Sequence, residues 1–326
     1  MTLGLSSNRV PRWLTEGISV REERRARPGW GSEMIPQFLA AYYDDELPPV
    51  SRLNEGFIRP KSPGHLGLAY HMASMVVEWI EETRGFDSVL RMLRAYGEGQ
   101  STEQVLRTGL RMEPEAIDKA FDAWLRAKYP PALEGQLRVQ MEGAQEAIEK
   151  GDTATAMRQL QRAAELMPSW GEPGQSPLAV LAALHVRSGN NRAAAEVLTR
   201  LTAVNENAYD ENVKLAELLQ PLGDNRGAAA ALERAIYMYP YEISLHSKLA
   251  ELYAGLGDRT RAVRERTAVV ALKPVDEAEA RYQLALALSQ AGDRTGARRE
   301  VLRALEVAPS FERAQELLLQ LREGGG

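Results

Sequence analysis

The sequence predicts an all-α protein in which a partial helical domain, residues 1–132, precedes an α-solenoid of helical hairpins, residues 133–311. Three observations carry this prediction. A Gly-Asp or Gly-Asn pair recurs about every 34 residues in the second part, alanine occupies the same two positions in every recurrence, and no strand-rich stretch is found. Residues 312–326 are expected to form a capping helix and a glycine tail.

The composition excludes several classes of protein. Of the 326 residues, 44% are hydrophobic and 26% are charged, the proportions of a folded domain. Without cysteine there can be no disulfide, thiolate metal site or cysteine nucleophile. No apolar run is long enough for a transmembrane segment. The net charge is −5, with 17 basic and 18 acidic residues in 1–130, so no nucleic-acid partner is expected.

Six helices are predicted in the first part, because apolar residues recur there at helical spacing. The pattern is clearest from Leu68 to Glu82 and from Ala116 to Lys128. The acidic run Asp44-Asp45-Glu46, just before two prolines, is expected to be a solvated turn. The predicted helices cover residues 12–26, 32–44, 65–84, 86–97, 101–109 and 114–128.

The second part is divided by regular turn signals. Glycine followed by Asp or Asn occurs at Gly151-Asp152, Gly189-Asn190, Gly223-Asp224, Gly257-Asp258 and Gly292-Asp293. We expect the glycine to adopt the left-handed conformation that ends one helix, and its polar neighbour to support the turn. Proline follows 17 residues later in four of the five copies, where it stops the second helix, and Glu206 takes that place in the other. Each unit is therefore predicted to be a helical hairpin.

Small residues indicate where the two helices of each hairpin approach closely. Alanine lies five residues after and seven residues before all five glycines. The 34-residue unit resembles the tetratricopeptide repeat (TPR), whose conserved small residues and proline are matched by Ala216, Ala228, Ala235 and Pro240. Gly143 and the insertion at 169–176 depart from the pattern. The five predicted repeats cover residues 137–170, 175–208, 209–242, 243–276 and 278–311, with a cap helix at 311–322.

The resemblance to TPR proteins implies a groove along the first helices that binds an extended peptide or a partner protein. The Lys and Asn that the family uses to clamp acidic C-termini are not present at the matching positions, so such a clamp is not expected. His185 is predicted to be a packing residue, and His246 to face a neighbouring helix or solvent. The predicted groove residues are Ala179, Ala183, Val213, Glu217, Ser247, Glu251, Tyr282 and Leu286.

The first part resembles a second family. The segment from Pro11 to Glu23, PRWLTEGISVREE, is similar to an element of the peptidase-MA-like, or gluzincin, zinc metallopeptidases. The segments 57–60, 68–80 and 85–125 are similar to later parts of the same domain. The resemblance covers about residues 1–130 and implies that this part is the C-terminal portion of such a domain.

This second resemblance implies roles for two residues. Glu16 would be the third zinc ligand, and Tyr70 would stabilise an oxyanion. The other two ligands and the general base come from an H-E-x-x-H helix, which this sequence does not contain. That helix would lie before Met1. His65 and His71 are six residues apart and do not share one helix face, so they are not expected to replace the missing ligands.

Two functions follow as expectations. The first is a protein-interaction scaffold joined to part of a peptidase-MA-like domain that is not catalytically competent as it stands, with no cofactor of its own. The alternative is a zinc-dependent peptidase whose H-E-x-x-H helix lies upstream, with the repeats recruiting substrate or partner. No signal peptide is evident, which fits a cytoplasmic protein, but a leader could precede Met1 and export is left open.

Overall fold

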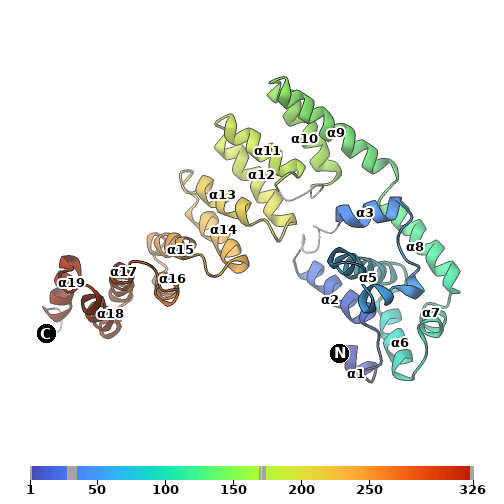
Figure 1. Ribbon diagram of the computed structural model, residues 1–326, viewed down its shortest axis with the longest axis horizontal. Helices are drawn as coiled ribbons and strands as arrows, with labels where there is room; N and C mark the ends of the chain where they lie inside the picture. Colours follow the sequence, from blue (N-terminus) through green and yellow to red (C-terminus); the bar gives the residue numbers. More distant parts are fainter. Residues whose placement is uncertain (1, 28–34, 169, 171–173, 324–326) are drawn as a thin grey trace. The chain divides into compact units, whose positions relative to one another are not determined.

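The computed structural model describes residues 2–27, 35–168, 170 and 174–323, and all regular structure in these ranges is helical. The helices group into two compact units, which are described separately (Figure 1). The first unit contains the residues up to Leu184 together with Arg200–Glu206, and the second contains His185–Thr199 and the residues from Asn207 onward. The boundary passes through α11 (Pro177–Arg187) and α12 (Asn191–Val204). No described helix is long and apolar enough to cross a membrane.

Within residues 2–27 and 35–128, the first unit begins with eight α-helices and one short 3-10 helix that do not repeat. They are α1 (Thr2–Leu5), α2 (Arg12–Ala26), α3 (Ile35–Tyr43), η2 (Val50–Arg52), α4 (Glu55–Ile58), α5 (Pro63–Arg84), α6 (Phe86–Gly97), α7 (Thr102–Leu110) and α8 (Pro114–Lys128). The six helices predicted from the sequence are confirmed, although residues 32–34 lie outside the described range. The short helices α1, η2 and α4 were not predicted.

Local signals explain where these helices begin and end. The Ser62 hydroxyl accepts a hydrogen bond from the His65 amide at 3.2 Å, and proline follows in the first helical position, so α5 begins there. Gly85, with φ of 75°, ends the same helix. Ser101 and Gln104 form a reciprocal capping box at the start of α7.

Helix α5 lies at the centre of the first unit, in contact with α2, α3, α4, α6 and α8. Its segment from His71 to Ile80 is buried throughout, because packing partners surround it on every side. Trp13 and Leu14 of α2 and Phe38 of α3 are fully buried in the same core. At Gly17, the backbone of α2 approaches α5 so closely that an added Cβ would lie 2.7 Å from the carbonyl oxygen of Ala73.

The first hairpin shares this core. It consists of α9 (Ala132–Glu149) and α10 (Thr153–Leu166), which pack against each other. Leu137, Ala163 and Met167 are buried in the same hydrophobic cluster as the non-repeating helices. Hydrophobic packing is therefore continuous across residue 132, the predicted end of the first domain.

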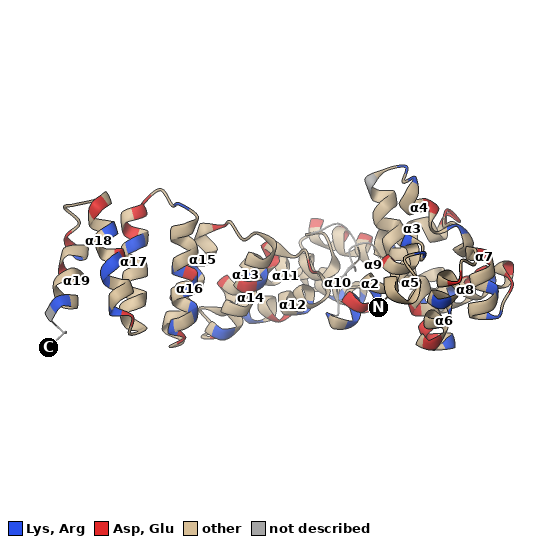
Figure 2. Ribbon diagram, turned by 90° about the horizontal axis from the view of Figure 1, so that it is seen from below, with Lys and Arg blue, Asp and Glu red and all other residues tan. Residues whose placement is uncertain are grey.

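The second unit continues as helical hairpins, and from α13 to α19 each helix packs against the next one along the chain. This nearest-neighbour packing is the arrangement expected of a solenoid. Both signs of charge are interspersed along it (Figure 2). Its helices after α12 are α13 (Tyr209–Leu219), α14 (Asn225–Met238), α15 (Ile243–Gly255), α16 (Arg259–Ala271), α17 (Glu277–Gln290), α18 (Arg294–Val307) and α19 (Glu312–Glu323).

The predicted turn chemistry is confirmed in all five hairpins. Every glycine of the Gly-Asp and Gly-Asn pairs has a positive φ, between 73° and 90°. The following Asp or Asn accepts a hydrogen bond from the amide three residues later, at 2.8–3.2 Å, and so caps the second helix. The ten predicted alanines are all buried, with exposed fractions of at most 3%. The cap helix α19 lies where it was predicted, shifted by one residue.

Candidate functional site

The predicted groove positions lie on the first helix of each hairpin. In the second unit, Val213, Ser247, Tyr282 and Leu286 are half-buried, whereas Glu217 and Glu251 are exposed. Two further positions belong to α11 in the first unit, where Ala179 is buried and Ala183 is exposed. Burial of Ala179 makes it a packing residue in this structure, because little of its side chain is left for a ligand.

Ion pairs lie along this side of the second unit, and one of them joins two neighbouring first helices. Glu217 of α13 lies 3.2 Å from Lys214 on its own helix and 3.9 Å from Lys248 of α15. Glu251 of α15 lies 3.6 Å from Arg266 of α16. At least one partner of each pair is exposed, so each pair stabilises the fold only weakly.

The same surface becomes aromatic near the C-terminal end. The rings of Tyr282 in α17 and Phe311 lie 5.2 Å apart, and the Arg313 guanidinium lies 5.1 Å from the centre of each ring. Arg313 also forms an ion pair with Glu279 at 2.7 Å. Tyr282 and Leu286 pack against the core formed with α18 and α19, so the cap helix partly covers these two predicted groove residues.

In the first unit, the structure brings Glu16 and Tyr70 to one arginine. The Nη2 atom of Arg12 lies 3.4 Å from the Glu16 carboxylate and donates a hydrogen bond to the Tyr70 hydroxyl at 3.0 Å. The Phe57 ring stacks edge-on against Tyr70 at 5.0 Å and lies 5.7 Å from the Arg12 guanidinium. Two residues separated by 54 positions and singled out by the peptidase resemblance are therefore neighbours in space.

The residues around Glu16 do not fit a zinc ion. No group of three His, Asp or Glu side chains converges among the described residues as a metal site would require. His71 is buried against the ring of Phe38, at 5.0 Å between ring centres, while His65 lies in the first turn of α5. The Glu16 carboxylate meets the positive charge of Arg12 instead.

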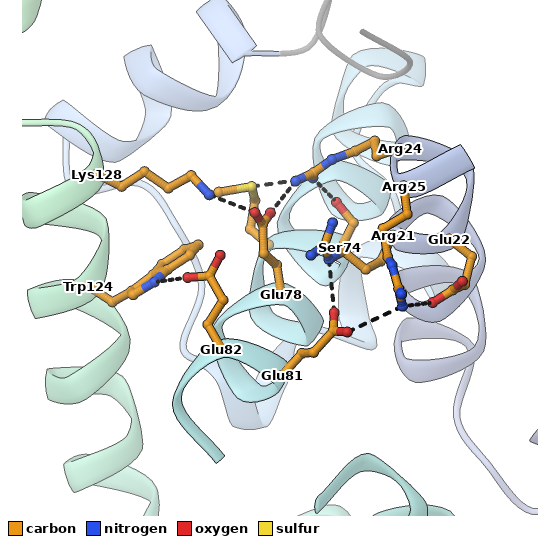
Figure 3. A network of polar contacts seen from close by, with 11 residues as sticks. Arg21, Glu22, Arg24, Arg25, Ser74, Glu78, Glu81, Glu82, Trp124 and Lys128 are labelled. Atoms are coloured by element: carbon orange, nitrogen blue, oxygen red, sulfur yellow. Dashed lines mark hydrogen bonds and ion pairs between the residues drawn. The ribbon is translucent and has the colours of Figure 1, made fainter. Parts of the chain in front are cut away.

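A polar network ties α2 to α5 and α8 beyond this cluster (Figure 3). Glu78 of α5 is buried and pairs with Arg24 of α2 and with Lys128 of α8, the latter at 2.7 Å. Arg24 also donates to the Ser74 hydroxyl at 2.8 Å. Burial alone would raise the pKa of Glu78, but the hydrogen bond from Lys128 and the charge of Arg24 outweigh it, and the pKa is lowered.

A second layer of this network is more exposed. Glu81 pairs with Arg21 at 3.2 Å and with Arg25 at 3.3 Å, and the Trp124 indole donates to Glu82 at 2.9 Å (Figure 3). The sequence analysis missed this network. A detectable signal was Glu78, the one charged residue in the otherwise mainly apolar segment 72–80, since buried carboxylates need partners.

The first unit also contains a pocket of about 320 Å3 between the 42–50 segment, α5 and α8. The Tyr42 hydroxyl donates to Asp122 at 3.2 Å, and the Val50 amide donates to Asp118 at 2.8 Å. Burial raises the pKa of Asp118. Residues 44–46 are exposed, which confirms the predicted solvated turn. Asp45 of that turn also lines the pocket, a role that the sequence did not indicate.

The chain was compared with known proteins. No protein-family model matches the sequence, and a comparison with curated proteins found no match. Three solved structures each resemble 54% of this chain. MamA of Desulfovibrio magneticus is 17% identical, with a TM-score of 0.35 and 97% of its own chain covered. YrrB is 17% identical, with a TM-score of 0.38 and 89% of its chain covered, and a kinesin light chain of Podospora anserina is 20% identical, with a TM-score of 0.34 and 96% of its chain covered. YrrB is described as a TPR protein with an unusual peptide-binding site, and the kinesin light chain as having TPR-like repeats. The hairpins, turns and buried alanines of this chain themselves confirm the predicted all-α fold with a TPR-like solenoid.

Proposed function

We propose that this chain is a protein-interaction scaffold whose first helices bind a peptide or a partner protein. One observation carries the proposal. Successive first helices of the second unit keep the same two positions at least partly accessible, and Glu217 and Lys248 link two of these helices along that side. A surface built from equivalent positions of a repeat can contact an extended ligand at regular intervals.

Peptide selection on the full chain tests this proposal. Peptides selected from a random library are expected to bind wild type and to lose binding to Ser247→Arg, which places a large charged side chain at the centre of the surface. Glu306→Arg on α18 is the matched control, because Glu306 is exposed on a second helix and should leave the affinity unchanged. Selected peptides that are sensitive to Glu306→Arg and indifferent to Ser247→Arg would refute the proposal.

A second proposal concerns the first unit, as the C-terminal part of a peptidase-MA-like domain. The meeting of Glu16 and Tyr70 at Arg12 supports it. A complete site would need two imidazoles and a general base from an H-E-x-x-H helix that the chain does not contain. Reading the gene upstream of Met1 is the direct test. An in-frame H-E-x-x-H would support the peptidase, and a stop codon immediately before Met1 would rule it out.

If such a helix exists, the zinc content of variants of the extended protein shows whether Glu16 is a zinc ligand. The extended protein is expected to bind zinc, and Glu16→Ala to lose it, while Glu22→Ala on the exposed side of the same helix retains it. Equal zinc content in both variants would show that Glu16 is not a ligand.

A further inference from the structure

Four tyrosines lie at or beside the loop that joins α14 to α15 in the second unit. Tyr237, Tyr239 and Tyr241 are 76%, 61% and 81% exposed. Tyr209, at the start of α13, stacks edge-on against Tyr239 with 4.8 Å between ring centres. We call these four residues the tyrosine patch. Exposed aromatic side chains gathered in one place are typical of surfaces that bind a partner.

The array itself shows that hairpin packing does not require these rings. Thirty-four residues later, the equivalent positions of the next loop hold Ala271, Lys273 and Val275. That loop joins α16 to α17 in the same way, with no aromatic residue. The three exposed tyrosines are therefore special to one loop of the array.

Acidic side chains outnumber basic ones around the patch. One exposed cation lies nearby, Arg234 of α14, whose Nε donates to Asn212 at 2.8 Å. Asp210 and Glu211 lie in the first turn of α13, and Glu242 begins α15. Neither residues 201–213 nor residues 235–247 contain Lys or Arg. Asp210 and Glu211 form no hydrogen bond or ion pair through their carboxylates with any described residue. The pKa of Tyr209 is raised, first by burial and then by Glu242 and Asp210, as expected if these carboxylates act at the rings.

A buried contact holds the loop in place. The ring of His246 on α15 lies within hydrogen-bonding distance of two groups: its Nε2 is 2.9 Å from the Pro240 carbonyl oxygen, and its Nδ1 is 2.6 Å from Glu265 of α16. His246 and Glu265 are both buried. The loop between Tyr239 and Tyr241 is thus fixed from beneath by the hairpin core, so a ligand would not need to order it.

We propose that the tyrosine patch binds an arginine-rich segment of a partner protein. A guanidinium can stack on an exposed ring and pair with a carboxylate at the same time, which an ammonium does less well. The flanking Asp210, Glu211 and Glu242 supply the complementary charge. This patch lies on the loop edge, and none of its residues is among the predicted groove positions, so the site goes beyond the proposed function.

Binding of a short fluorescent peptide of alternating arginine and serine to the full chain tests the proposal by fluorescence anisotropy. Replacing Tyr237, Tyr239 and Tyr241 by alanine together is expected to weaken binding roughly tenfold, the sum of three exposed cation–π contacts. The control is Val275→Ala, which shortens a fully exposed apolar side chain at the position equivalent to Tyr241 and should leave the affinity unchanged. A lysine–serine peptide should bind more weakly than the arginine peptide.

Charge and stacking are separated by a second variant. Asp210→Asn with Glu242→Gln is expected to weaken binding and to reduce its dependence on salt, while the side-chain amide introduced by the second change can still cap α15. Unchanged affinity of the triple tyrosine variant would overturn the proposal, as would equal binding of a neutral proline-rich peptide. Library peptides that bind the first helices and are sensitive to Ser247→Arg should bind the triple tyrosine variant with unchanged affinity. Failure of this proposal can therefore be distinguished from failure of the proposed function.

Discussion

At the scale of single residues, Gly17 shows how one position can set the distance between two helices. It lies where α2 crosses α5, and the backbone of Ala73 fills the space that a side chain would need. The neighbouring residue, Glu16, faces Arg12 rather than the core. The Glu-Gly pair therefore combines a polar contact with a close approach, and the approach alone explains why glycine is needed.

Gly17→Ala is expected to destabilise the chain by about 2 kcal/mol, because the added Cβ meets a carbonyl oxygen that cannot move without shifting α5. Gly135→Ala is the matched control: Gly135 also lies in a helix, α9, but has no atom near its Cβ. That change should stabilise by roughly 0.5–1 kcal/mol. Urea denaturation measures both, and a Gly17→Ala variant as stable as wild type would contradict the crossing described.

The residues that the sequence predicted best are those defined by local geometry. A left-handed turn, a helix cap and a buried alanine each depend on neighbours within a few positions, so spacing alone located them. The meeting of Arg12 with Tyr70 depends on two helices packing across 58 positions, which no local pattern encodes. The resemblance to a known family suggested Glu16 and Tyr70, but Arg12 between them emerged only from the structure.

At the scale of elements, the network around Glu78 makes the packing of α2, α5 and α8 sensitive to acid. Its pKa lies below the usual 4.5 in the folded chain, because Lys128 and Arg24 together outweigh the effect of burial. A carboxyl group of this kind stabilises the fold fully above its unfolded-state pKa, and the stabilisation is lost as pH falls through the lower folded-state value.

The melting temperature of wild type is therefore expected to fall more steeply below pH 4.5 than that of Glu78→Gln. At neutral pH the same substitution should cost about 2 kcal/mol, since it leaves two cations beside a neutral amide. Glu142→Gln, on the exposed side of α9, should change neither quantity. Parallel pH profiles of wild type and Glu78→Gln would show that the network does not couple to folding.

In two hairpins a buried glutamate pairs with a basic side chain at the same register. His246 faces Glu265 at 2.6 Å and Arg281 faces Glu300 at 2.8 Å, each separated by 19 residues. At the equivalent positions of the second repeat stand Leu178 and Val197. In the third repeat the same positions hold the buried Asn212 and Ala231, and Asn212 donates to the Ala208 carbonyl oxygen and accepts from Arg234 instead. A polar residue is therefore accommodated at this register wherever its hydrogen bonds are met, and an apolar pair can take its place.

His246→Leu alone is expected to cost about 3 kcal/mol, because it leaves the buried Glu265 carboxylate without its main partner. The double variant His246→Leu/Glu265→Val should lie within about 1 kcal/mol of wild type, since a buried ion pair is readily replaced by apolar residues of similar size. A double-mutant cycle by denaturation measures the coupling. Equal losses in the single and double variants would refute the interpretation that an apolar pair can take the place of His246 and Glu265.

At the scale of the whole molecule, periodicity decided how much could be predicted. The repeats were found because the same short-range signals recur five times, and their helices lie where the spacing placed them. The first unit has no repeat, so the sequence predicted its helices but not how they pack. The tyrosine patch escaped notice for a related reason: its members come from two helix ends and a loop, and only the folded array brings them together.

Because hairpins of the second unit contact mainly their neighbours, its stability should be local. Removing residues 312–326 takes away Ala314 and Leu317, which cover Ala285, Val301 and Ala304. Hydrogen exchange is expected to quicken in α17 and α18 and to stay unchanged in α5. Faster exchange throughout the chain would mean that the units unfold together.

The positions of the two buried glutamates and their partners, within one hairpin each, have a consequence for how such an array can change in length. Both members of each pair lie within a single hairpin, 19 residues apart, and each 34-residue unit carries its own glycine turn and cap. A duplication or deletion of one whole unit would thus copy or remove both partners at once and leave no buried glutamate unpaired. We expect a chain in which residues 243–276 are duplicated in tandem to fold, whereas an insertion that splits the pair should not.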